Sequence, residues 1–174
     1  SYYSGNISEI LNFRGGGMAI HGGLLGGVLA GYIYTKVKKL NFFKMADCVV
    51  LGIPLAQAIG RWGNYLNKEA HGGPTDLPWG IMVDGVKVHP TFLYESIWDL
   101  GVFIFLMLFR KKQKYEGQIL VYYITLYSIG RFFIEGLRTD SLMLGPLRMA
   151  QVISLGFILI GVILNYVLSK KNKR

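Results

Sequence analysis

The sequence lacks the residue patterns of disulfide-stabilised, metal-binding and nucleotide-binding proteins. It has a single cysteine, Cys48, inside an apolar run, so no internal disulfide framework can form. Neither a His-x-x-x-His nor a Cys-x-x-Cys spacing occurs, which argues against a zinc site. The Walker loop, the G-x-S-x-G turn and the clustered carboxylates of metal-dependent phosphatidyl transfer are also missing. We therefore expect a chemistry that needs no metal and no other cofactor.

Charged residues are scarce, and the acidic ones are fewer than the basic ones. Of 174 residues, 17% are charged and 52% are hydrophobic, with 10 acidic and 19 basic residues and a net charge of +9. A soluble domain has about 25% charged and 45 to 50% apolar residues. The basic residues are gathered in short stretches rather than spread over one face, which argues against a nucleic-acid partner. This composition indicates an integral membrane protein.

Long apolar segments recur along the chain. A membrane-spanning helix needs about 20 apolar residues, with a range of about 17 to 25. Five segments meet or approach this length, near 18–35, 46–65, 91–109, 117–137 and 148–168. The sequence therefore predicts an all-α fold, a polytopic helical bundle that forms a single membrane domain over residues 1–174.

The basic residues fix the expected orientation of this bundle. Twelve of the 19 lie in three stretches, after the first, third and fifth apolar segments. With five spans these stretches fall on one side, which the positive-inside rule assigns to the cytoplasm. The N-terminus of this chain is then external and its C-terminus cytoplasmic. In the external loop between the second and third segments, Asp84-Gly85 between short apolar runs predicts a small β-hairpin.

Three arginines lie in or at the outer ends of the apolar segments, where orientation does not call for positive charge. An arginine at the membrane centre costs about 2.5 to 3.5 kcal/mol on insertion scales, so it needs a partner or a function. Arg61 shares one helical face with Gln57 and Asn64, at spacings i, i+4 and i+7. It could be a residue that only reaches the interface, but Asn64 and the nearby Glu69 favour a site.

The other two arginines form a ladder with a glutamate. Arg131, Glu135 and Arg138 are spaced i, i+4 and i+7 on one helical face. Such a ladder can simply lock a bundle, yet its excess positive charge also suits a phosphate. Glu95 is expected to be the counter-ion of an arginine, because an unpaired carboxylate at that depth would be protonated instead. Asp47 is expected to be structural.

Four segments resemble one family. The stretch 60–72, GRWGNYLNKEAHG, fits the pattern G-R-x-G-N-[FY]-x-N-x-E-x-x-G of the prolipoprotein diacylglyceryl transferases at every defined position. The segments GGMAIHGG (16–23), HPTFLYE (89–95) and RFFIEGLR (131–138) resemble further family segments in the same order. Family members have seven membrane helices, two of them before the His-Gly-Gly helix. We therefore expect this chain to be the C-terminal part of a longer transferase.

The resemblance implies an activity. A member of this family transfers the diacylglyceryl group of phosphatidylglycerol to the lipobox cysteine thiol of a preprolipoprotein, releases glycerol-1-phosphate and so begins lipoprotein maturation in the bacterial cytoplasmic membrane. The expected partners are phosphatidylglycerol, the lipobox segment and the lipid bilayer. The alternative is an anion- or lipid-binding membrane transporter whose arginines hold an anion without transfer.

The resemblance also implies roles for individual residues, which fall into three groups. The expected catalytic residues are His21, Arg61 and Arg131. The expected substrate-binding residues are Arg61, Asn64, Asn67, Glu69, Gly72, Tyr94 and Arg131, and the expected supporting residues are Glu95, Glu135 and Arg138. His21 is the candidate base for the thiol, although two nearby arginines could lower the pKa of the thiol enough without it.

Overall fold

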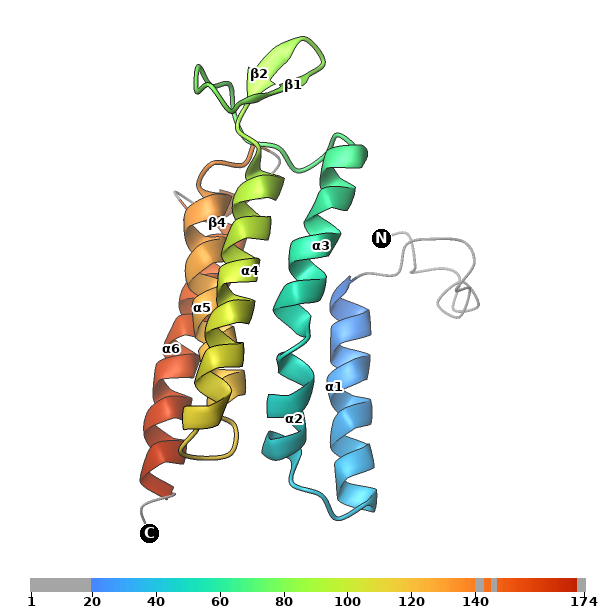
Figure 1. Cartoon of the computed structure of the whole chain (residues 1–174), viewed down its shortest axis with the longest axis vertical. Coiled ribbons are helices and arrows are strands. Elements are labelled where there is room, and N and C mark those ends of the chain that lie inside the picture. Colours follow the sequence, from blue (N-terminus) through green and yellow to red (C-terminus); the bar gives the residue numbers. More distant parts are fainter. Residues whose placement is uncertain (1–19, 140–142, 145–146, 172–174) are drawn as a thin grey trace, which may run out of the picture. The chain divides into compact units, whose positions relative to one another are not determined.

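The computed structural model describes residues 20–139, 143–144 and 147–171, which are mostly helical (Figure 1). The helices are α1 (Ile20–Val37), α2 (Phe42–Val50), α3 (Ile53–Leu66), α4 (Thr91–Phe109), α5 (Gln118–Glu135) and α6 (Met149–Lys171), with a 3-10 turn η2 (Arg110–Lys112). The prediction of a helical protein is confirmed. The chain divides into two compact units, Ser1–Phe42 and Phe43–Arg174, so α1 belongs to the first unit and the helices from α2 onward belong to the second.

Among the described residues, fewer helices than predicted are both long and apolar enough to cross a membrane. Two qualify, Thr91–Lys112 and Met149–Lys170, and the bent pair α2–α3 would make a third. Helices α1 and α5 have 18 residues each, but polar side chains lower their hydropathy. In α5 these include Arg131 and Glu135, two of the predicted site residues. The charged residues of the predicted site therefore also lower the hydropathy by which a membrane-spanning helix is recognised.

The second predicted span, 46–65, is not one continuous helix. It consists of α2 and α3, which meet at a bend of 41°. Pro54, in the first turn of α3, has no N–H for a helical bond to Val50 and its ring would clash with that carbonyl. The first turn of a new helix tolerates proline, so the break lies just before it, at Leu51 and Gly52.

Within the second unit the helices α3, α4, α5 and α6 pack in sequence order, each against the next (Figure 1). A buried cluster of Val50, Val102, Leu106 and Ile119 joins α2, α4 and α5 toward the η2 end. Most of α6 has its apolar side chains exposed, for example Leu159 and Ile163. An apolar surface of this kind is what a lipid environment accommodates.

Asp47 ties α2 to the start of α5. This buried carboxylate accepts hydrogen bonds from the backbone N–H of Gly117 (2.6 Å) and Leu120 (2.9 Å), and from Nε2 of Gln113 (2.5 Å). The first N–H groups of a helix have no partner within it, so a carboxylate placed there satisfies them. The expectation that Asp47 is structural is confirmed. We call this the basic end of the unit, because Arg110, Lys111 and Lys112 lie there.

A small hairpin lies at the opposite end, which we call the hairpin end (Figure 1). Strands β1 (Ile81–Val83) and β2 (Val86–Val88) are antiparallel and are joined by Asp84 and Gly85. Both turn residues have positive φ, 47° and 84°, as a two-residue type I′ turn requires. The predicted hairpin is confirmed. A second pair, β3 (Met143–Leu144) and β4 (Leu147–Arg148), has no counterpart among the predictions.

Candidate active site

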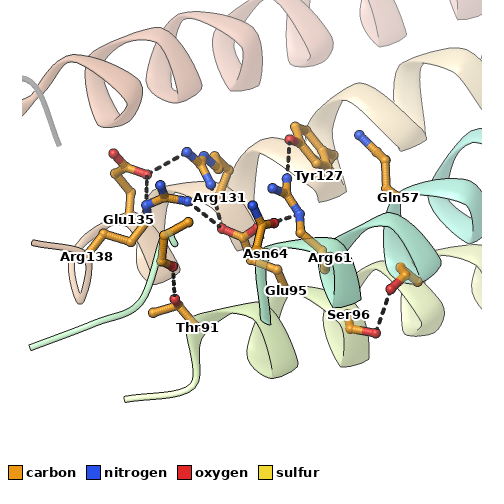
Figure 2. Close-up of polar contacts among 12 residues, drawn as sticks. Gln57, Arg61, Asn64, Thr91, Glu95, Ser96, Tyr127, Arg131, Glu135 and Arg138 are labelled. Atoms are coloured by element: carbon orange, nitrogen blue, oxygen red, sulfur yellow. Dashed lines mark hydrogen bonds and ion pairs between the residues drawn. The ribbon is translucent and has the colours of Figure 1, made fainter. Parts of the chain in front are cut away.

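A buried glutamate on α4 joins the arginines of two other helices (Figure 2). Glu95 is 5% exposed. Its Oε2 lies 2.5 Å from Nε of Arg61 on α3 and forms an ion pair that lacks hydrogen-bond geometry. Its Oε1 accepts a 2.5 Å hydrogen bond from Nη1 of Arg131 on α5. The expected pairing of Glu95 with an arginine is present, and one carboxylate holds two guanidinium groups side by side.

A second glutamate completes the cluster from α5 itself. Oε2 of Glu135, also buried, lies 2.8 Å from Nη2 of Arg131 and 3.9 Å from Nε of Arg138. Arg138 also approaches Glu95, with Nη1 3.8 Å from Oε1. The i, i+4, i+7 ladder predicted from the sequence therefore exists, but it is linked to α4 and α3 through Glu95. We call these five residues, Arg61, Glu95, Arg131, Glu135 and Arg138, the arginine cluster.

Neighbouring polar contacts fix the backbones that carry the cluster. The hydroxyl of Ser96 donates to the carbonyl of Ala58 at 2.8 Å, which ties α4 to α3 beside Arg61 (Figure 2). The α6 residue Gln151 donates from Nε2 to the carbonyl of Phe132 at 3.2 Å. Arg148 donates from Nη1 to the carbonyl of Glu135. The last turn of α5, which carries Arg131 and leads into Arg138, is thus closed by side chains from β4 and the start of α6.

The cluster has three guanidinium groups and two carboxylates, hence one excess positive charge. The side chains of Arg61 and Arg131 are each 21% exposed, whereas those of Glu95 and Glu135 are 6% and 4% exposed. The carboxylates are therefore enclosed, while the arginine side chains stay partly accessible. Guanidinium groups oriented in this way can bind phosphate oxygens with two parallel hydrogen bonds.

A third carboxyl group lies next to the cluster, one helical turn along α4 from Glu95. Asp99, one turn after Glu95 on α4, is 2% exposed, and its Oδ2 makes no hydrogen bond within the described part of the chain. It borders a cavity of about 10 Å³, also lined by Arg61, Arg131 and Tyr127. That volume holds about one water molecule. The cavity is therefore too small for a phosphate group.

The end of α3 and the loop after it hold the remaining polar residues of the stretch 60–72, which we call the signature; its part after α3, residues 67–72, is the signature loop. The amide nitrogens of Asn64 and Asn67 both donate to Oε1 of Glu69, each at 3.1 Å. Lys68 and Ala70, on either side of Glu69, have left-handed φ values of 55° and 57°. Such a conformation costs about 1 to 2 kcal/mol per non-glycine residue, and it is kept here by the tight loop. The signature thus gathers its amides around one carboxylate, one turn beyond Arg61.

Gly72 lies where this loop passes between α4 and α5. Its N–H donates to the carbonyl of His89 at 2.9 Å, and it forms an isolated β-bridge with Arg138. A Cβ at this position would lie 2.6 Å from Cβ of His89 and 3.0 Å from the carbonyl oxygen of Leu137. Only glycine leaves room for this approach. The packing accounts for the glycine without a ligand, and its expected role in substrate binding stays a prediction.

Tyr94 belongs to a different group of side chains. Its hydroxyl accepts a 2.9 Å hydrogen bond from Nε1 of Trp79 and lies 3.4 Å from Nδ1 of His89. Tyr94 thus lies with two rings at the base of the hairpin, although it immediately precedes Glu95 in the sequence. Its expected contact with a substrate stays a prediction.

His21 lies in α1, within the first unit, and its side chain falls outside the described residues. Its proposed part in proton transfer stays a prediction.

Two tyrosines near the cluster were not predicted as site residues from the sequence. Nη2 of Arg61 donates to the hydroxyl of Tyr127 at 3.4 Å (Figure 2). The hydroxyl of Tyr123 donates to Oε1 of Gln57 at 3.0 Å. The signal was available for Tyr127, because it lies four residues before Arg131 and so shares its face of α5. For Gln57 the face shared with Arg61 was recognised, but its partner on another helix was not.

Comparison with known proteins gives one consistent result. The family model described as prolipoprotein diacylglyceryl transferase matches residues 1–167. A protein of Clostridioides difficile (strain 630) is 78% identical over 173 residues, which cover 99% of this chain and 70% of that protein. Relatives from Finegoldia magna and Clostridium novyi are 55% and 54% identical, over 94% and 99% of this chain and 66% and 71% of their own lengths. All three are named phosphatidylglycerol–prolipoprotein diacylglyceryl transferase.

Proposed function

This chain belongs to the prolipoprotein diacylglyceryl transferase family, and on that premise we propose that it transfers the diacylglyceryl group of phosphatidylglycerol to the lipobox cysteine of a preprolipoprotein. The observation that supports this proposal at the site is the arginine cluster, in which buried Glu95 holds Arg61 and Arg131 side by side and both arginine side chains stay partly accessible. The product would be a thioether-linked prolipoprotein, the first step of lipoprotein maturation.

The chemistry is an alkyl transfer at a glycerol carbon. The sulfur of the cysteine thiolate attacks the carbon that bears the phosphate ester, and the C–S bond forms as the C–O bond breaks. The leaving oxygen keeps the electron pair, so the glycerol-1-phosphate that departs carries one more negative charge than the phosphodiester. The thiol proton leaves to a base. No electrons are gained or lost overall, and the reaction needs no metal or cofactor.

Arg61 and Arg131 supply what this reaction needs most, positive charge where negative charge develops. A preorganised donor aimed at a developing oxyanion contributes about 2.7 to 4 kcal/mol, or about 100- to 1000-fold in rate. Glu95, Glu135 and Arg138 act as supports, because they fix the orientation of the two catalytic arginines through the ion pairs described above.

The signature loop and the first unit provide the remaining roles. Asn64, Asn67, Glu69 and Gly72, together with Tyr94, are assigned to substrate binding near the hairpin end. His21 is assigned as the base that takes the thiol proton. A free thiol has a pKa of about 8.5, so only a modest base is required.

The proposal includes an orientation in the bacterial cytoplasmic membrane. The chain would contribute five spans, with the apolar helix α4 and the exposed apolar side chains of α6 in contact with lipid. The hairpin end would face outward and the basic end, with Arg110, Lys111 and Lys112, would face the cytoplasm. Lipid and secreted acceptor would then meet at the outer boundary.

A transfer assay tests the function. The full-length protein in nanodiscs would receive phosphatidylglycerol labelled in its acyl chains and a lipobox peptide, and the expected result is a labelled peptide whose mass increases by one diacylglyceryl group. A peptide with serine in place of cysteine is the control and should stay unlabelled. Binding of phosphatidylglycerol without transfer would contradict the proposal and favour a transporter or lipid-binding protein.

The role of His21 has its own test. His21→Asn keeps the size and polarity of the side chain but cannot accept a proton near neutral pH. Loss of a general base costs about 100- to 10,000-fold, and part of this loss should be recovered as higher pH forms more thiolate. A pH–rate profile with the wild-type shape and only a reduced height would remove His21 as the base and leave it a group that positions the lipid.

A further inference from the structure

A second and larger cavity lies at the hairpin end, beyond the arginine cluster. Its volume is about 260 Å³, compared with about 10 Å³ for the cavity under Arg61. It is bounded on one side by the end of α3 and the signature loop, and on the other by β1 and Phe92 at the start of α4. We call it the hairpin cavity. The mechanism above uses some of its lining residues, but it assigns no substrate to the cavity.

The edge of strand β1 borders this cavity. Three consecutive residues, Ile81, Met82 and Val83, line it. Successive side chains of a strand point to opposite faces, so a cavity that touches all three runs along the edge of the strand rather than under one face.

The outer edge of β1 presents backbone hydrogen-bonding groups that the hairpin itself does not use. Beside the type I′ turn, Val83 and Val86 form the hydrogen-bonded pair, so Met82 and Lys87 form the next, non-hydrogen-bonded pair, whose backbone groups point away from each other. The carbonyl of Lys87 indeed accepts a hydrogen bond from the N–H of Thr75 at 2.9 Å, outside the hairpin. On β1, the N–H and carbonyl of Met82 correspondingly face the outer edge. An exposed strand edge of this kind can pair with an extended polypeptide.

The walls of the hairpin cavity suit a side chain of such a polypeptide. Tyr65, Leu66, Ile81 and Phe92 form apolar surface, and Tyr65 stacks on Phe92 with ring centroids 4.9 Å apart. An acyl chain could also use apolar surface, but it could not use the backbone donor and acceptor of Met82. The combination of strand edge and apolar recess therefore favours a peptide over a lipid tail.

The hairpin cavity also lies close to the proposed reaction centre. Asn64 lines it, and Asn64 is one helical turn after Arg61, which lines the small cavity of the arginine cluster. One turn of helix spans about 5.4 Å, and adjacent residues of an extended chain are about 3.3 Å apart. A peptide in the hairpin cavity can therefore bring a neighbouring cysteine to a lipid bound at the arginines.

We propose that the hairpin cavity is the binding site of the acceptor polypeptide, which adds to the open edge of β1 as a third strand and inserts an apolar side chain next to its cysteine into the recess. This inference rests on the proposed function, because it assigns the second substrate of that reaction. The arginine cluster then binds the lipid phosphate, and the two substrates occupy separate sites.

The first test removes one backbone donor from the strand edge. Met82→Pro deletes an N–H that the hairpin does not use, and Met82→Ala is the matched control that shortens the same side chain and keeps the N–H. Since one hydrogen bond is worth about 0.5 to 1.5 kcal/mol net, the KM for a lipobox peptide should be about three- to tenfold higher in Met82→Pro than in Met82→Ala. The KM for phosphatidylglycerol should be the same in both.

A second variant leaves the hairpin untouched. Leu66→Trp adds volume at the mouth of the cavity, and Ile59→Trp adds the same volume on the same helix at a residue that lines neither cavity. The peptide KM should rise about fivefold or more in Leu66→Trp and stay unchanged in Ile59→Trp, since the loss of one apolar side-chain contact costs about 1 to 3 kcal/mol.

Binding and transfer, measured separately, distinguish the two proposals. Binding of a fluorescent lipobox peptide is measured in phosphatidylcholine nanodiscs, which hold no transferable lipid, and transfer is measured in phosphatidylglycerol nanodiscs. Active wild-type protein with equal peptide KM in Met82→Pro and Met82→Ala, or in Leu66→Trp and Ile59→Trp, overturns the inference and leaves the proposed function standing. Peptide binding that weakens in Met82→Pro in a protein without any transfer supports the inference and overturns the proposed function.

Discussion

Two buried carboxylates, Asp47 at the basic end and Glu95 toward the hairpin end, tie helices together in different ways. Asp47 is satisfied by two backbone N–H groups and one side-chain amide, all of them neutral donors. Glu95 is paired with the guanidinium groups of two arginines, whose side chains are each 21% exposed and which have further N–H donors. Both are about 5% exposed, so burial alone does not distinguish them.

The two carboxylates differ in the hydrogen-bonding groups that remain available around them. Once Asp47 has capped α5, its hydrogen-bonding capacity is used inside the fold. Glu95 uses one edge of Arg61 and of Arg131 and orients the rest of each guanidinium group. The first arrangement completes a structure, and the second builds a positively charged site with its geometry already fixed. This contrast predicts which substitutions should change activity and which should change stability alone.

The largest effect is expected for Arg131→Lys. An ammonium group cannot form the two-pronged contact with a phosphate, nor can it contact Glu95 and Glu135 with separate nitrogens as Arg131 does. Transfer should fall about 1000-fold or more, since the change removes both a donor to the leaving group and the geometry of the cluster. Lipobox-peptide transfer and genetic complementation would measure it, and near-wild-type activity would show that Arg131 has no phosphate role.

Glu135→Gln should have an intermediate effect, on stability more than on substrate choice. The amide keeps the shape of the side chain but removes a buried negative charge from Arg131 and Arg138, which should lower the free energy of unfolding by up to about 3 kcal/mol. Thermal unfolding in detergent would measure this loss. A variant that folds normally but changes its preference among lipid head groups would instead place Glu135 in contact with the lipid.

The sequence predicted the members of the cluster better than its connections. The spacing of Arg131, Glu135 and Arg138 is local, and a helix of known period puts them on one face whatever surrounds it. The need of a buried carboxylate for a cation likewise predicted that Glu95 pairs with an arginine. That Glu95 would bridge α3 and α5 depends on which helices are neighbours, and apolar lipid-facing and protein-facing surfaces look alike in a sequence.

The sequence was less informative about the backbone. The apolar run over 46–65 has the length of one span, and its composition does not reveal that the helix breaks at Gly52 ahead of Pro54. Gly72 fits a motif, yet the reason for a glycine appears only where His89 and Leu137 crowd it in space. The hairpin was predictable because its signal, Asp84-Gly85, is contained in two adjacent residues.

Asp47→Asn should affect stability alone. The amide oxygen can still accept one of the hydrogen bonds, but the charge that strengthens them is lost and an N–H₂ faces the donors at the start of α5. A cost of about 1 to 3 kcal/mol in the free energy of unfolding is expected, with an unchanged kcat for the folded protein. Comparison with Asp76→Asn, an exposed aspartate, controls for the loss of charge. A fall in kcat in well-folded Asp47→Asn would contradict the contrast with Glu95.

The smallest effect is expected for Tyr127→Phe, which tests whether neutral partners matter at the cluster. The hydroxyl of Tyr127 lies 3.4 Å from Nη2 of Arg61, near the upper limit for a hydrogen bond, whereas Glu95 holds the same arginine with an ion pair of 2.5 Å. Removing the hydroxyl should therefore lower kcat only about two- to threefold, within the range of one weak hydrogen bond. Tyr123→Phe is the matched control, because Tyr123 stacks on Tyr127 but bonds to Gln57. The contrary outcome is a fall in kcat in Tyr127→Phe as large as that in Arg131→Lys, with kcat unchanged in Tyr123→Phe. The hydroxyl of Tyr127 would then contact the reacting groups, and the carboxylates would not be the groups that set the geometry of Arg61.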